Sequence, residues 1–223
     1  MCNLYSSTTA SEAMRQMFAV RPELDQLGNA EPLPAIWPKY PGHVVRLTED
    51  GERELTTLSW GFRTTNKSKK TGKILQPAAW NNARDDKVAS SGLWKHSFQH
   101  RRCLIPATSF CEAKGRSPAT YFWFALKGDE ARPPFAFAGM WQLSRFEAPD
   151  GPDECATYTM ITTTANDLVR PIHPTRMPVI LRPDDYDRWL DGSPGDALDL
   201  LRPYPADEMR IVQRGEDAKS DPS

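Results

Sequence analysis

The most distinctive chemistry in this sequence lies in its first two residues, Met1 and Cys2. An initiator methionine followed by a residue as small as cysteine is normally removed, and we expect its removal here. Cys2 would then carry a free α-amine beside its thiol, groups with reference pKa values of about 7.8 and about 8.5. The amine can condense with an aldehyde, and the thiol can close a thiazolidine ring on the imine carbon. Alternatively, Cys2 is only a small second residue.

Two further residues are candidates for proton transfer. Glu112 lies in the otherwise apolar or small stretch of residues 110–113, so its side chain either lies on a solvated face or is buried. A buried glutamate has a raised pKa and can exchange protons near neutral pH. His173 lies in a proline-flanked segment, and its ordinary pKa near 6.5 suits the same task. A purely structural role is equally consistent with its position.

Several basic residues are candidates for phosphate contact. Arg84, two residues after Asn82, and Arg176 could each hold a phosphate bidentately or pair with a carboxylate. A loop at residues 66–73 is rich in lysine, which is typical either of a solvated surface or of a phosphate-contacting loop. Its candidate DNA-binding residues are Lys67, Lys69 and Lys70.

Composition narrows the class of protein. The 223 residues carry a net charge of -1, so a nucleic-acid site would have to be a local patch rather than a global basic field. The four cysteines have no CxxC spacing, and we expect no metal and no cofactor. No apolar run is long enough to cross a bilayer, so we expect a cytoplasmic protein with reduced thiols and no membrane partner. We also expect a monomer.

The hydrophobic pattern predicts one α+β domain built on a curved, mostly antiparallel sheet with a few short helices. Hairpins are expected around residues 44–60 and 109–126, and two further strands at 135–141 and 155–163. A helix is expected over residues 86–100, with an acidic N-cap. The domain should span residues 2–214. Residues 215–223 are polar and charged, which predicts a disordered tail.

Five short motifs, in this order, resemble those of the SOS response-associated peptidase (SRAP) family, also called abasic-site-processing proteins. The resemblance covers about residues 2–213. The motifs are Met1-Cys2, Trp60-Gly61, Asn82-Ala83-Arg84, Arg102-Cys103-Leu104-Ile105-Pro106-Ala107 leading to Phe110 and Glu112, and His173 ahead of Arg176-Met177-Pro178.

This resemblance implies a barrel-like single domain with a basic groove for single-stranded DNA. It implies that Cys2 attacks the ring-opened aldehyde of an abasic site and forms a thiazolidine DNA–protein crosslink. Asn82 would position the deoxyribose and the N-terminus, and Arg84 would contact phosphate. Glu112 would serve proton transfer and crosslink reversal, and His173 would protonate the sugar ring oxygen.

The peptidase label implies that the same residues remove Met1. Two departures from the family pattern bear on DNA binding. Asn3-Leu4 follows Cys2 where many members have Gly-Arg, so an early arginine is missing, and residues 36–41 replace a common Asn-Val-Ala-Pro run. Two alternatives stay open, a thiol peptidase acting on other proteins and a non-covalent single-strand binder. Only thiazolidine formation requires Cys2 to be terminal.

Overall fold

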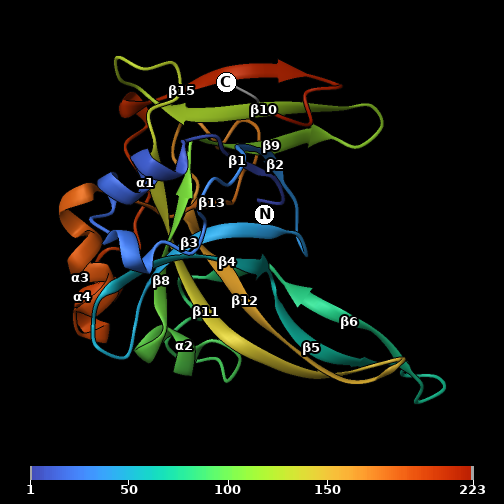
Figure 1. The fold of residues 1–223 in the computed structure, drawn as a ribbon. Helices are drawn as coiled ribbons and strands as arrows, with labels where there is room; N and C mark the ends of the chain where they lie inside the picture. Colours follow the sequence, from blue (N-terminus) through green and yellow to red (C-terminus); the bar gives the residue numbers. More distant parts are fainter. Residues whose placement is uncertain (1, 222–223) are drawn as a thin grey trace.

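A closed five-stranded barrel forms the centre of the protein in the computed structural model, which describes residues 2–221 (Figure 1). Strand β12 pairs with β4 in parallel, and β4–β3, β3–β8, β8–β11 and β11–β12 pair antiparallel, which closes the ring. The barrel strands are β3 (Pro41–Leu47), β4 (Arg53–Trp60), β8 (Arg102–Ala107), β11 (Phe135–Ala148) and β12 (Gly151–Thr164).

Three short strands pair with the barrel strands β11 and β12. β7 (Asn82–Arg84) pairs in parallel with β12, and β13 (Arg176–Pro178) pairs antiparallel with β12. β14 (Ile180–Leu181) pairs with β11. A separate hairpin of β5 (Phe62–Lys67) and β6 (Ile74–Trp80) projects away from the barrel (Figure 1).

A second sheet of antiparallel strands lies above the barrel in Figure 1, in the order β15-β10-β9-β1-β2. Its strands are β1 (Tyr5–Ser7), β2 (Leu33–Ile36), β9 (Ser109–Gly115), β10 (Ala119–Leu126) and β15 (Met209–Gly215). Tyr5 joins the sheet to the barrel, because its ring packs edge-on against Trp60 at 5.1 Å and Phe137 at 5.8 Å. Such aromatic pairs contribute about 1 kcal/mol each beyond the area they bury.

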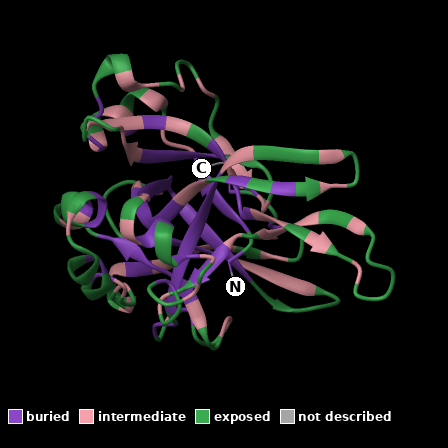
Figure 2. Ribbon diagram, turned by 90° about the horizontal axis from the view of Figure 1, so that it is seen from below, coloured by how far each residue is buried: buried purple, intermediate pink, exposed green. Residues whose placement is uncertain are grey.

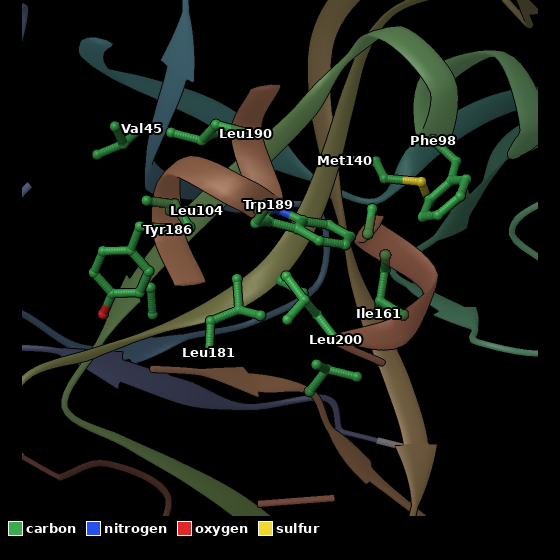
Figure 3. Close-up of a cluster of buried hydrophobic side chains, with 14 of the residues drawn as sticks. Val45, Phe98, Leu104, Met140, Ile161, Leu181, Tyr186, Trp189, Leu190 and Leu200 are labelled. Carbon is green, nitrogen blue, oxygen red and sulfur yellow. The ribbon is translucent and has the colours of Figure 1, made fainter. Parts of the chain in front are cut away.

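Short helices cover one side of the barrel. Figure 2 shows buried residues along the barrel strands and exposed residues on the outer faces of these helices. Trp189 packs with Leu104 and Leu181 in the core between helices and barrel (Figure 3). The helices are α1 (Ser11–Met17), η1 (Pro22–Leu24), α2 (Lys95–His100), η2 (Pro183–Asp185), α3 (Tyr186–Asp191), α4 (Pro194–Asp199) and η3 (Ala206–Glu208). None of the helices in residues 2–221 is long and apolar enough to span a membrane.

The predicted single α+β domain with a mostly antiparallel barrel is confirmed. The predicted helix over residues 86–100 is wrong in its extent, because only α2, its last turn and a half, is helical and turns precede it. Ser90, Ser91 and Gly92 interrupt the segment, and these residues favour turns over helix interiors. Asp86 therefore caps no helix and instead pairs with Arg84 at 2.7 Å.

The predicted disorder from residue 215 onward is also wrong as far as the structure describes the tail. Gly215 is the last residue of β15, and the following residues fold back against the domain. Asp221 is fully buried and forms an ion pair with Arg132 at 2.7 Å. Polar composition predicted disorder, but a buried, fully bonded carboxylate holds this segment in place. Residues 222–223 lie outside the described residues.

We predict that Gly42→Ala destabilises the fold. A Cβ at this position in β3 would overlap the hydroxyl of Tyr158 and lie 2.5 Å from the hydroxyl of Tyr5, two groups that hydrogen-bond to each other. Overpacking of this kind costs about 1–3 kcal/mol. Urea denaturation measures the loss, and Gly92→Ala is the matched control, since nothing lies within 4 Å of its added Cβ. Equal stabilities of the two variants would contradict the prediction.

Candidate active site

Cys2 is fixed by hydrogen bonds from two asparagines to its carbonyl. Asn82 Nδ2 donates to this oxygen at 2.6 Å and Asn81 Nδ2 donates at 3.2 Å. The thiol is fully buried and donates to the Leu4 carbonyl at 3.4 Å. Leu4 is itself held on β9, since its carbonyl accepts from Cys111 N–H at 2.9 Å. The nucleophile candidate therefore has a defined position although it lies near the start of the chain.

The barrel positions the two asparagines. Asn82 lies on β7 opposite Met160 of β12, and the Asn81 carbonyl accepts from the indole N–H of Trp60 at 2.8 Å. Asn82 is 9% exposed, and its Oδ1 has no hydrogen-bond partner within residues 2–221. A buried amide oxygen without a partner is uncommon and leaves an acceptor available to a ligand.

Glu112 comes from β9 of the second sheet, opposite Phe122 of β10. Its side chain is buried, and its Oε1 also has no hydrogen-bond partner in the part of the chain that is described. Burial raises the pKa of Glu112 to about 7, because the charged form loses its hydration. The carboxyl group can therefore both accept and release a proton near neutral pH.

His173 lies in a turn that follows β12. Its backbone N–H donates to the Val169 carbonyl at 2.9 Å, and its Nδ1 lies 2.9 Å from the Arg176 carbonyl. The turn is held by Asn166, whose Oδ1 accepts from Val169 N–H at 3.0 Å and from Leu168 N–H at 3.1 Å. Burial lowers the pKa of His173 below its ordinary value, which favours the neutral imidazole.

One pocket of about 310 Å³ brings Glu112 and His173 together. Asn3 and Leu4 form part of its wall, so Cys2 lies directly beside it, and Cys2 Sγ is 3.9 Å from the Cys111 carbonyl. Burial, reinforced by the nearby Glu112 charge, raises the pKa of the Cys2 thiol well above its ordinary value. The remaining residues that line the pocket are Trp37, Cys111, Ala113 and Tyr121.

The structure thus brings Cys2, Asn82, Glu112 and His173 into one cluster from four separate segments. Sequence reasoning missed Asn81, Trp37 and Tyr121. Asn81 directly precedes the Asn82-Ala83-Arg84 motif, so it could have been predicted from the sequence. The two aromatic residues carried no signal, because only strand pairing places Trp37, which follows β2, and Tyr121, which lies on β10, next to this pocket.

The predicted phosphate-contacting arginines lie apart from this pocket. Arg84 and Arg176 line a separate surface hollow together with Asp85 and Asp86. Arg84 is exposed and pairs with Asp86, whereas Arg176 is mostly buried, pairs with Asp85 at 2.6 Å and donates to the Thr162 carbonyl. Arg176 therefore also ties β13 to β12 and fixes the turn that carries His173.

The predicted lysine contacts lie further away. Lys67 is the last residue of β5, and Lys69 and Lys70 lie in the turn that joins β5 to β6. All are exposed at the tip of the projecting hairpin (Figure 1). They line neither the Glu112 pocket nor the hollow of Arg84.

A single α+β barrel domain with Cys2 held beside a glutamate–histidine pocket defines the class of protein. The chain belongs to the SOS response associated peptidase (SRAP) family, whose profile matches residues 1–217. It is 33% identical over 177 residues to Abasic site processing protein YoqW of Bacillus subtilis, covering 77% of this chain and 74% of the relative. Abasic site processing protein YoaM of the same organism is 30% identical over 222 residues, covering 96% and 90%.

A solved structure supports the same fold. A protein from Bordetella bronchiseptica superimposes with a TM-score of 0.72 at 29% identity, covering 95% of this chain and all of the other. The family resemblance seen in the sequence motifs is therefore confirmed by sequence and by structure.

We predict that Glu112→Gln flattens the pH dependence of stability. Burial raises the carboxyl pKa from its ordinary 4.5 to about 7, so between these pH values the folded protein binds more protons than the unfolded chain. The free energy of unfolding contributed by Glu112 therefore falls as pH rises through this window, by up to about 3 kcal/mol. Urea titrations of the wild type and Glu112→Gln at about pH 5 and about pH 8 measure this change in the free energy of unfolding.

The exposed Glu147→Gln is the control for this titration and should retain the wild-type pH dependence. If the Glu112→Gln profile also followed the wild type, the raised pKa of Glu112 would be disproved.

Proposed function

We propose that this chain, after removal of Met1, traps abasic sites in single-stranded DNA as a covalent thiazolidine crosslink through Cys2. The observation that carries the proposal is the Asn82 hydrogen bond to the Cys2 carbonyl, which fixes the aminothiol residue beside the pocket of Glu112 and His173. The names of the relatives support the substrate, since both are abasic site processing proteins.

An abasic deoxyribose exists mainly as a closed hemiacetal, so the ring has to open before an aldehyde is available. In the proposed reaction the imidazolium form of His173, the minor form near neutral pH because burial lowers its pKa, donates a proton to the ring oxygen as the C1–O bond breaks. The C1 hydroxyl returns a proton to the imidazole as it becomes the aldehyde. The neutral α-amine of Cys2 attacks the aldehyde carbon, and the carbinolamine loses one water to give an imine. The thiol sulfur then adds to the imine carbon, and its proton passes through Glu112 to the nitrogen. One water is released, and nothing is oxidised or reduced.

The electrostatics of the cluster suit this sequence of steps. The raised pKa of Cys2 keeps the thiol protonated, so the amine reacts first and the sulfur becomes nucleophilic only when a base removes its proton. Glu112, with a pKa of about 7, is suited to accept that proton and to return it during crosslink reversal. Asn82 Oδ1 and Glu112 Oε1, which have no hydrogen-bond partner among residues 2–221, would accept hydrogen bonds from the hydroxyl groups of the sugar.

In the proposed complex, basic side chains outside the pocket contact the phosphates of the DNA strand. The ion pair of Arg84 with Asp86 is solvent-exposed on both sides, so exchanging the aspartate for a phosphate costs little. Arg176 lies in the same hollow, and Lys67, Lys69 and Lys70 would contact the strand further along the β5–β6 hairpin. Removal of Met1 by the same cluster belongs to the proposal, although Met1 lies outside the described residues.

We predict that abasic single-stranded DNA forms a species with the wild-type protein that survives denaturing electrophoresis, and that Cys2→Ala abolishes it. No sulfur is available to close the ring in that variant, whether or not Met1 is removed from it. Cys155→Ala is the matched control, because Cys155 lies on β12 outside the Glu112 pocket and should leave the crosslink unchanged.

The other outcomes separate the alternatives. A stable crosslink in Cys2→Ala would exclude Cys2 as the nucleophile, and DNA retention without any covalent species would favour a non-covalent binder. Cleavage of foreign peptides that depends on Cys2 but not on a free α-amine would favour a peptidase. Intact-mass measurement shows whether Met1 is absent from the reacting protein.

We predict that Glu112→Gln slows release of the crosslinked DNA by about 10²-fold or more, the range expected for loss of a general acid–base group. The amide is similar in shape but cannot carry the proton back to sulfur. Release is followed by chase with unlabelled abasic DNA, with Glu147→Gln as the control. Unchanged release kinetics in Glu112→Gln would remove this residue from the proposed reaction.

A further inference from the structure

We infer that the C-terminal segment, residues 218–221, is part of the DNA-binding surface and places Lys219 at the rim of the Glu112 pocket as a phosphate contact. This inference rests on the proposed function. The segment lies beyond residues 1–217, the part of the chain that the family profile matches.

Asp221 anchors the end of the segment. Arg132 Nε donates to its Oδ2 at 2.7 Å and Arg132 Nη2 to its Oδ1 at 3.0 Å, and Ser109 Oγ donates to its Oδ2 at 2.6 Å. The backbone of Asp221 is held as well, since its N–H donates to Pro34 and its carbonyl accepts from Ser6. Asp221 therefore bonds to β1, β2 and β9 at once, including the two strands that lead to Cys2 and Glu112.

Ala218 anchors the start of the segment. Its carbonyl accepts from the indole N–H of Trp123 at 2.7 Å, and its side chain packs in a small apolar cluster with Leu4 and Cys111. Both of these neighbours line the Glu112 pocket. The backbone of Lys219 is thus held on both sides, by Ala218 before it and Asp221 after it.

Lys219 lies over a residue of the pocket wall. Its Nζ is 5.9 Å from the ring centre of Tyr121, within the range of a cation–π contact, and Tyr121 lines the pocket with Glu112 and His173. The lysine is exposed, and no carboxylate within residues 2–221 forms an ion pair with it. Glu216 and Asp217 are exposed nearby in the chain, but the Lys219 ammonium group stays available to a ligand.

A strand whose abasic sugar enters this pocket carries a phosphate on each side of that sugar. A cation at the rim is therefore well placed to bind one of them, and Tyr121 and Trp37 offer aromatic surface to an adjacent base. Asn3 and Leu4, which follow Cys2 and line the pocket, are both uncharged, so neither side chain supplies a cation to this rim. The anchored tail supplies one instead.

The experiment is equilibrium binding of single-stranded DNA that contains a tetrahydrofuran analogue of an abasic site, which cannot crosslink. Lys219→Ala should weaken binding several-fold at low salt and reduce the slope of log affinity against log salt by about 0.7, the value for one phosphate contact on a single strand. Lys219→Arg should restore both. Lys95→Ala, on α2, is the matched control and should bind like the wild type.

An unchanged salt slope in Lys219→Ala would overturn the inference, as would failure of Lys219→Arg to restore it. Circular dichroism melting verifies that each variant is folded as the wild type. Because the analogue forms no covalent bond, this result is independent of the crosslinking assay. If the wild-type protein formed no crosslink with DNA that carries a natural abasic site, that result would instead contradict the proposed function.

Discussion

The antiparallel pairing of the N-terminal segment with β9 is the interaction on which the site depends. A chain start is ordinarily free to move, because nothing holds it from one side. Here β1 lies between β2 and β9, and Tyr5 packs into the barrel against Trp60. Asn82 completes the arrangement from the barrel side by binding the Cys2 carbonyl. Cys2 is therefore held at the junction of the two sheets.

Burial at that junction sets the chemistry of the cluster. It raises the pKa of both the Cys2 thiol and the Glu112 carboxyl and lowers that of His173, so each group is shifted toward its neutral form. In the proposed reaction, a neutral thiol and carboxyl suit the attack of an uncharged amine on an aldehyde, followed by single proton transfers. An exposed cluster of the same residues would hold a charged carboxylate and would leave the proposed imine open to water.

The first and the last described segments of the chain meet at the same sheet. The family fold supplies the barrel and the pocket, whereas the tail from Ala218 to Asp221 adds bonds to β1, β2 and β9 that lie beyond the matched residues. Asp221 is buried, and its carboxylate is satisfied by Arg132 and Ser109, which makes the contact specific. Composition could not reveal this, because a charged tail predicts disorder unless its partners are known.

The sequence by itself determined the residue types and the fold class. The alternating apolar strands require an antiparallel sheet with a shared core, and Cys2, Asn82, Glu112 and His173 could be recognised because each lies in a short motif. Tertiary structure decided which of them meet, and it placed Arg84 and Arg176 in a separate hollow with two aspartates. It also added Trp37 and Tyr121 to the pocket. The physical reason is that local patterns fix strands and turns, whereas contacts between residues about a hundred positions apart depend on strand order and register.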